Sequence, residues 1–170
     1  MKGHVLLSHG LESGPAATKV TAMAEQAERL GWRTTRPDFR DLDATGDPAR
    51  IADRVERLLG HVVPGEPLVL AGSSMGAFAS ALASRRTACR GLFLVAPPLA
   101  IPGFAARLDP AAAPTELVHG WHDELIPAGE VVAFAAARAL PLHLVDDSHR
   151  LAAHVATVAR WFGLFLERLD

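Results

Sequence analysis

The sequence predicts an α/β protein with three layers, in which a parallel sheet of about six strands is covered by helices on both faces. Short runs of apolar residues alternate along the chain with longer amphipathic segments. Strands separated by helices form parallel sheets. The short runs are almost wholly apolar, as expected of strands that are buried on both faces.

The first three elements are a strand, a helix and a strand. The apolar run His4–Leu7 predicts the first strand. A helix is expected over Thr18–Leu30, because its pattern is helical up to Gly31 and glycine commonly ends helices. The run Trp32–Thr35 predicts the second strand, which Pro37 closes.

The central part of the chain repeats this alternation. A helix is expected over Pro48–Leu59, because proline suits the first turn of a helix and Gly60 follows its last apolar position. The apolar run Leu68–Ala71 predicts the next strand. The alanine-rich stretch Met75–Arg86 predicts the helix that follows it.

The remaining elements complete the sheet and its cover. The runs Leu92–Val95 and Glu116–His119 predict two strands, and the segment between them, rich in proline and alanine, is expected to be a loop. A helix is expected over Ala128–Ala139, and Leu142–Val145 predicts the last strand. The chain is expected to end in a helix over Arg150–Leu169.

Length and composition indicate one globular domain spanning residues 1–170. Hydrophobic residues make up 49% of the chain and charged residues 21%, and the formal net charge is −2. These values exclude a disordered chain and a membrane-embedded one. The near-neutral charge is spread along the chain, which argues against binding to nucleic acid or to an anionic membrane.

Two features favour a cytoplasmic protein. The single cysteine, Cys89, cannot form an internal disulfide, which fits a reducing compartment. The apolar residues Val5–Leu7 are too few for the core of a signal peptide or for a membrane span.

The most informative motif is Gly72-Ser73-Ser74-Met75-Gly76, which reads G-x-S-x-G between a predicted strand and a predicted helix. This arrangement is typical of a nucleophile elbow, a turn so tight that larger residues on either side of the serine would collide. We therefore expect Ser74 to stand exposed above the sheet at the start of a helix. Ser73 is the weaker candidate, because only Ser74 has glycine two residues away on both sides.

Partners for this serine follow later strands. A serine hydroxyl needs a base, the base needs an orienting carboxylate, and the order after an elbow is serine, acid, histidine. Asp123 and His149 supply that order, and both follow predicted strands, whose carboxyl ends form the ligand-binding edge of such sheets. Asp146 and Asp147 are rival acids, but they lie close to His149 in sequence and are typical of loop or capping residues.

Together these features resemble the α/β-hydrolase superfamily, in particular its small, lidless serine hydrolases related to dienelactone hydrolases and carboxylesterases. The matching segments are Ser8-His9-Gly10-Leu11 after the first strand, Gly72–Gly76 at the elbow, His119–Pro127 around the acid, and Ser148-His149 at the base. They are spread over almost the whole chain.

The resemblance implies a role for each matching residue. Ser74 matches the nucleophile, His149 the general base and later acid, and Asp123 the carboxylate that orients the histidine. The backbone N–H groups of Met75 and Leu11 match the oxyanion donors. The implied reaction is acyl transfer to water through an acyl-serine intermediate, with no cofactor.

Other polar residues near these motifs are expected to be structural. The resemblance assigns His9 to holding the oxyanion loop. Asp38, Arg40, Asp41 and Asp43 are expected in a solvated loop, with the rim of the pocket as the alternative. Glu12 is expected to face water, with contact to the substrate as the alternative. His119 and His122 are not expected to bind a metal, because no fourth ligand lies nearby.

The chain also departs from the family pattern. Two antiparallel strands at the edge of the usual eight-stranded sheet are missing, and no cap follows Leu92–Val95. The pocket should therefore be shallow and open, with an apolar lining expected from Leu11, Leu99, Ile101 and Phe104. Many dienelactone hydrolases use a cysteine nucleophile, so the serine at the elbow argues against carrying over lactone specificity.

The function that these residues favour is hydrolysis of small carboxylic esters or thioesters by a serine hydrolase, with the small-molecule ester as its partner. Two alternatives stay open: a hydrolase-like binding or scaffold protein with little turnover, and an acyltransferase that uses the same residues on an alcohol, amine or peroxide. The sequence leaves the oligomeric state open.

Overall fold

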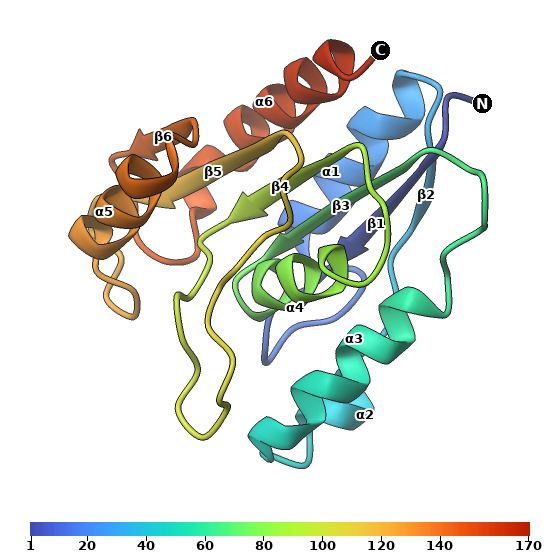
Figure 1. The fold of residues 1–170 in the computed structure, drawn as a ribbon. Coiled ribbons are helices and arrows are strands. Elements are labelled where there is room, and N and C mark those ends of the chain that lie inside the picture. The colour runs from blue at the N-terminus through green and yellow to red at the C-terminus, as the bar shows by residue number, and fades with distance from the viewer.

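The computed structural model describes residues 1–170 and contains one parallel sheet of six strands in the order β2-β1-β3-β4-β5-β6 (Figure 1). The strands are β1 (His4–Ser8), β2 (Arg33–Thr35), β3 (Leu68–Ser73), β4 (Gly91–Val95), β5 (Thr115–Gly120) and β6 (Leu142–Val145). The chain forms β1 first and then β2 at one edge of the sheet. It then crosses β1 and adds β3, β4, β5 and β6 in order toward the other edge. All carboxyl ends of the strands therefore lie at one edge of the sheet.

Helices cover both faces of the sheet. They are α1 (Thr18–Arg29), α2 (Arg40–Asp43), α3 (Ile51–Leu59), α4 (Met75–Ser84), α5 (Ala128–Arg138) and α6 (Val155–Arg168). Helices α1 and α6 pack side by side on one face, and α3, α4 and α5 lie on the other (Figure 1). The predicted three-layer α/β class is confirmed.

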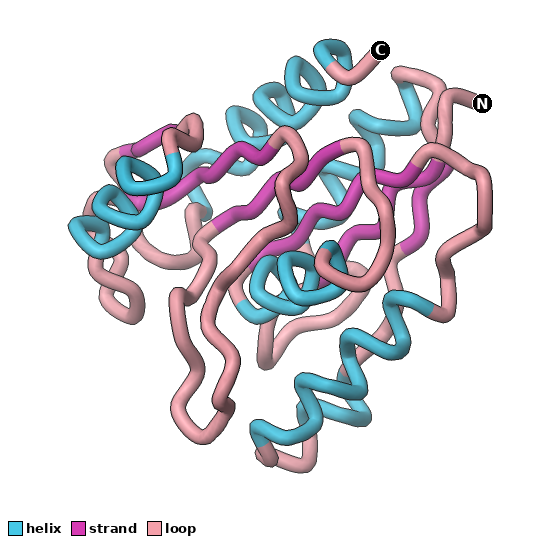
Figure 2. The backbone as a smooth tube through the Cα atoms, viewed as in Figure 1, coloured by secondary structure: helices cyan, strands magenta, loops and turns pink.

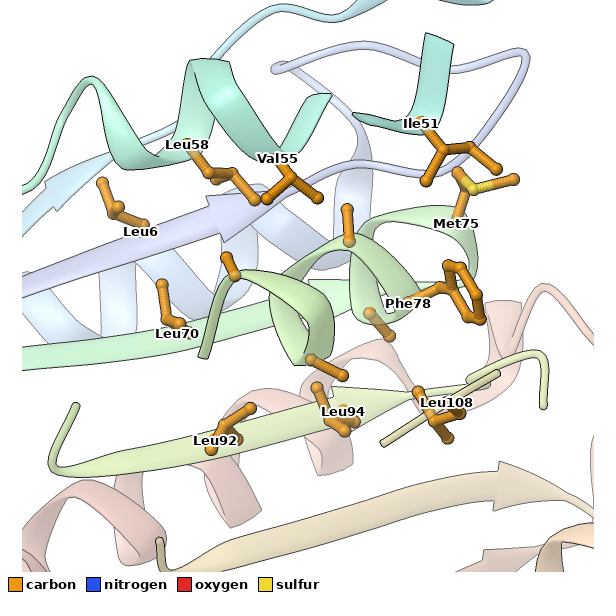
Figure 3. Close-up of a cluster of buried hydrophobic side chains, with 14 of the residues drawn as sticks. Leu6, Ile51, Val55, Leu58, Leu70, Met75, Phe78, Leu92, Leu94 and Leu108 are labelled. Carbon is orange, nitrogen blue, oxygen red and sulfur yellow. The ribbon is translucent and has the colours of Figure 1, made fainter. Parts of the chain in front are cut away.

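The core is divided by the sheet into two apolar clusters, because successive residues of a strand point to opposite faces. Along β1, Leu6 belongs to the cluster under α3 and α4, whereas Val5 and Leu7 belong to the cluster under α1 and α6. Figure 3 shows the first cluster, in which Phe78 of α4 lies between the sheet and α3. The four inner strands, β1, β3, β4 and β5, are buried throughout, as their apolar sequences predict, whereas the edge strands β2 and β6 are only partly buried.

The connection between β4 and β5 contains no cap. Figure 2 shows it as a long loop that extends beyond the sheet and returns, and an isolated antiparallel bridge joins Ala100 to Arg107. The sheet has six strands, all parallel. The expected architecture of about six parallel strands without a cap is therefore confirmed.

Two expectations on local structure are wrong. The segment after β2, expected as a solvated loop, contains the short helix α2. The last helix begins at Val155 rather than Arg150, because Leu151 has a left-handed backbone with φ of 51° and a short 3₁₀ turn, Ala152–His154, follows it. The predicted strands lie within two residues of the observed ones at each end.

None of the helices combines the length and the hydropathy that a helix needs to cross a membrane.

Candidate active site

Ser74 occupies a sharp turn between β3 and α4. Its backbone has φ of 55° and ψ of −119°, a conformation that disfavours any residue with a side chain. Two backbone hydrogen bonds hold it there: Ser74 N–H donates to Val95 O at 2.8 Å, and Phe78 N–H donates to Ser74 O at 3.1 Å. The strand, the helix and the neighbouring strand thus impose the turn that the motif predicts.

The two glycines of the motif allow α4 to approach the sheet. A Cβ atom on Gly72 would lie 2.4 Å from the carbonyl carbon of Gly76, and a Cβ on Gly76 would lie 2.0 Å from the Ser8 carbonyl oxygen. Neither distance is sterically possible, so both positions require glycine. This close approach also brings the end of β1 next to Ser74.

Ser74, His149 and Asp123 form a continuous line of hydrogen bonds. Ser74 Oγ lies 3.0 Å from His149 Nε2, and His149 Nδ1 lies 2.7 Å from Asp123 Oδ2. The three residues follow β3, β6 and β5, so the sheet edge brings together positions that are far apart in sequence. The carboxylate can only accept, which places a proton on Nδ1 and leaves the Nε2 lone pair facing the serine hydroxyl.

The Asp123 carboxylate is buried and fixed by the backbone. Its Oδ1 accepts from Leu125 N–H at 2.8 Å and from Ile126 N–H at 2.7 Å, which leaves Oδ2 for His149. Buried His119 stands beside it, with Nε2 3.3 Å from Asp123 Oδ2 and 2.8 Å from the Ile126 carbonyl oxygen. Both neighbours of that nitrogen are acceptors, so Nε2 carries the proton.

The two rival acids, Asp146 and Asp147, form hydrogen bonds with histidines other than His149. Asp146 bonds to His122 on the surface at 2.8 Å. Asp147 bonds to His154 at 2.8 Å and accepts from Ala153 N–H, which caps the turn before α6. His119 and His122 therefore do not converge, and no group of three or more His, Cys, Asp or Glu residues could hold a metal ion.

Two contacts that sequence reasoning missed hold the loop that carries His149. Glu124 Oε2 accepts from the His149 N–H at 3.1 Å. Lys19 of α1 donates from Nζ to the Arg150 carbonyl oxygen at 2.5 Å. These contacts hold the backbone on both sides of the imidazole, just before the left-handed Leu151.

Two backbone N–H groups are free beside the serine. Met75 opens α4, so its N–H has no partner within the helix. Leu11 lies in the turn after β1 and donates no backbone hydrogen bond. These are the two donors that the resemblance to the family implies for an oxyanion hole.

The loop that carries Leu11 rests on His9. His9 is buried, its Nε2 accepts from Phe39 N–H at 3.0 Å, and its Nδ1 lies 2.7 Å from the Gly10 carbonyl oxygen. Because Phe39 N–H can only donate, the proton is on Nδ1 and His9 is neutral. Burial lowers the pKa of His9, which agrees with this assignment.

Arg54 is the main residue of the site that sequence reasoning missed. Its side chain is only 1% exposed and forms an ion pair with Asp43, one of the residues expected in a solvated loop. The sequence does contain a signal that Arg54 is buried. Arg54 lies on the same helical face as three apolar residues, Ile51, Val55 and Leu58. Its contacts reach the loop that follows β1.

A cleft of about 870 Å³ opens above Ser74 and His149. Leu11 and Ile101 line it, as expected, together with Leu125. Leu99 and Phe104 do not line it. Both pack against the core under α3 and α4, where the Phe104 ring meets Phe78 edge-on at 6.1 Å between centroids, so their placement in the pocket was wrong.

Folding is expected to lose stability as the pH falls from 7.5 to 5.5, because two buried histidines must stay neutral. Burial is the main cause that lowers the pKa of both His9 and His4. His4 Nδ1 accepts from Arg33 at 2.9 Å, and its Nε2 lies 2.8 Å from Thr35 Oγ1. Below their ordinary pKa the unfolded chain binds protons that the native state does not, so stability rises with pH, by at most about 1.4 kcal/mol per pH unit for each histidine.

Urea unfolding at several pH values within this range measures that slope. In His4→Gln the slope should be smaller than in the wild type. Replacement of the exposed His61 by glutamine should change the slope much less, because the charge of His61 is the smallest of the causes that lower the pKa of His4. A wild-type stability that is flat between pH 5.5 and 7.5 would contradict the neutral assignment.

Comparisons with known proteins show the family and the fold of the chain. A family model described as "Alpha/beta hydrolase domain" matches residues 1–159. A solved structure of a hydrolase-superfamily protein from Xanthomonas campestris pv. campestris is 48% identical, with a TM-score of 0.90, over 98% of this chain and 99% of that one.

More distant structures share the fold. An alpha-beta serine hydrolase homologue from Coxiella burnetii is 25% identical, with a TM-score of 0.76, over 98% of this chain and 86% of that one. A serine hydrolase without lid from Xanthomonas campestris is 21% identical, with a TM-score of 0.67, over 96% and 81% of the two chains. No curated protein sequence matches this chain.

Proposed function

The chain belongs to the alpha/beta hydrolase family, and we propose that it is a serine hydrolase that cleaves small carboxylic esters or thioesters through an acyl-serine intermediate. The observation that carries the proposal is the line of hydrogen bonds from Ser74 through His149 to Asp123. The name of the similar Coxiella burnetii protein, a serine hydrolase homologue, supports the same chemistry.

Acylation follows from the protons assigned above. His149 Nε2 takes the proton from Ser74 Oγ as the oxygen attacks the ester carbonyl carbon, and Asp123 stabilises the imidazolium that forms. The negative charge that develops on the carbonyl oxygen lies near the N–H groups of Met75 and Leu11. When the tetrahedral intermediate collapses, its bond to the leaving oxygen or sulfur breaks, and His149 Nε2–H protonates that atom.

Deacylation repeats these steps with water. His149 removes a proton from water, whose oxygen attacks the acyl carbon. Breakdown of the second intermediate returns the electron pair and a proton to Ser74 Oγ and releases the carboxylic acid. The same residues therefore act in both halves of the reaction. The net result is one ester or thioester and one water converted to a carboxylic acid and an alcohol or thiol.

The cleft supports a small substrate. Apolar side chains of Leu11, Ile101 and Leu125 line it beside Ser74, and Leu11 and Leu125 are exposed at its surface. Since no cap covers the serine, water and substrate reach it directly. An open site of this kind favours short acyl groups over long chains that need an enclosed tunnel.

Labelling with a fluorophosphonate probe tests the proposal. The wild type should form a covalent adduct that intact mass detects and peptide mapping places on Ser74, and it should hydrolyse p-nitrophenyl acetate or butyrate. Ser74→Ala should do neither, because the attacking oxygen is gone.

The neighbouring buried serine provides a matched control. Ser73→Ala removes a hydroxyl that the hydrogen-bonded line does not use and should be labelled like the wild type. A wild type that is neither labelled nor active on any ester would reject the proposal and favour a binding protein instead. Labelling that persists in Ser74→Ala would also reject it.

A further inference from the structure

Two side chains, those of His9 and Arg54, form hydrogen bonds to the carbonyl oxygen of the peptide group between Gly10 and Leu11. We propose that Arg54, together with His9, is a positioning residue that aims the Leu11 N–H at the developing oxyanion. The inference rests on the proposed function, because it concerns a donor that this function uses.

One peptide group carries both the anchor and the donor. The Gly10 carbonyl and the Leu11 N–H belong to the same planar unit, and in a trans peptide they point in opposite directions. The Gly10 oxygen accepts from His9 Nδ1 at 2.7 Å and from Arg54 Nη2 at 3.4 Å. Fixing this oxygen therefore also fixes the direction of the N–H on the other side.

Arg54 holds the preceding peptide as well. Its Nη1 donates to the His9 carbonyl oxygen at 2.8 Å. Two consecutive carbonyl oxygens of the loop are thus bound by one rigid guanidinium group, which limits rotation of the peptide between them. Hydrogen bonds to a carbonyl also polarise its amide, which strengthens the N–H as a donor.

The guanidinium group is itself locked from its other side. Nε and Nη2 donate to the two carboxylate oxygens of Asp43 at 2.8 and 2.6 Å, and the guanidinium carbon lies 4.5 Å from the centre of the Phe39 ring. A planar fork with several donors can serve a carboxylate and two carbonyls at once. A lysine ammonium group cannot reproduce this geometry.

A purely stabilising role explains this arrangement less well. A buried ion pair is often no better for stability than apolar residues of similar volume. Arg54 shares a helical face with Ile51, Val55 and Leu58, so the other buried positions of this face are apolar. What the arginine provides is its reach to the His9 and Gly10 carbonyl oxygens.

Arg54→Lys tests the inference with two measurements. The ¹⁵N–¹H NMR signal of Leu11 should shift or broaden, whereas the signal of Met75, the other donor, should stay in place. Loss of one oxyanion donor lowers turnover about 10²–10³-fold, so a misdirected donor should lower kcat for p-nitrophenyl acetate about 10- to 100-fold with little change in KM.

Arg86→Lys is the matched control. Arg86 follows α4 and forms an exposed ion pair with Glu56 of α3, but makes no hydrogen bond to the loop after β1 or to the residues that hold it. This variant should keep the wild-type Leu11 signal and kcat. A double variant, Arg54→Met with Asp43→Leu, removes both charges, so it folds without an unpaired buried charge and should show the same Leu11 defect.

The outcomes separate the inference from the proposed function. An unchanged Leu11 signal in both Arg54 variants overturns the inference, as does a disturbed signal with wild-type kcat. A lower kcat with disturbed Leu11 and undisturbed Met75 supports it. If the wild type cleaves no ester, the proposed function fails, and the Leu11 signal alone still decides whether Arg54 positions the peptide.

Discussion

Ser74→Ala and His149→Ala are each expected to lower kcat for a small ester about 10⁵- to 10⁶-fold, and the double variant is expected to lose no more than either alone. The reason is that Ser74 Oγ and His149 Nε2, 3.0 Å apart, act as one unit. Without its base the hydroxyl is a weak nucleophile, and without the hydroxyl the base has no proton to take. Steady-state kinetics on p-nitrophenyl butyrate measure the effect.

Asp123→Asn extends this series with a loss of about 10⁴-fold. An amide nitrogen facing His149 would favour the tautomer with its proton on Nε2, which then cannot accept from Ser74. Asp146→Asn is the control, since Asp146 bonds only to His122 on the surface. Additive losses in the Ser74 and His149 double variant would contradict a shared role, and loss of activity in Asp146→Asn would move the acid to that residue.

The sheet and the order of the site residues could be predicted because both follow from local patterns in the sequence. Apolar runs identify strands buried on two faces, and residues that follow parallel strands meet at one edge. Ser74, Asp123 and His149 lie together for this reason. Glycine two residues away on each side of Ser74 also predicts its turn.

Long-range pairing explains what the sequence did not reveal. The apolar face of α3 indicates that Arg54 is buried, but Asp43 looks like an ordinary surface charge, and only the approach of α2 to α3 pairs the two against the loop after β1. The segment between β6 and α6 is likewise held by long-range contacts of Glu124 and Lys19. Nothing in the local sequence predicts these contacts.

The pocket lining was predicted only in part for a related reason. Ile101 and Phe104 lie in the same loop after β4, so their sequence positions predict that both line the cleft. The loop turns back on itself, and Phe104 packs on Phe78 while Ile101 faces the cleft. Loop conformation, rather than residue type, decides which apolar side chains a substrate meets.

Gly76→Ala is expected to destabilise the fold by about 3 kcal/mol or more, near the upper end of the effects of overpacking. The new Cβ would lie 2.0 Å from the Ser8 carbonyl oxygen and 2.7 Å from that of His9. Both atoms are backbone, so the clash cannot be relieved by a side-chain rotation. Helix α4 and strand β1 must move apart, which also displaces the loop that carries Leu11.

Gly129→Ala separates this clash from helix propensity. Gly76 and Gly129 are each the second residue of their helix, but a Cβ on Gly129 meets nothing within 4 Å. Alanine there should stabilise the protein by about 0.5–1 kcal/mol, because glycine is the weaker helix former. Urea unfolding of the two variants measures the difference. Equal stability would show that the elbow can relax, and the close packing of α4 on β1 would then not be what restricts position 76 to glycine.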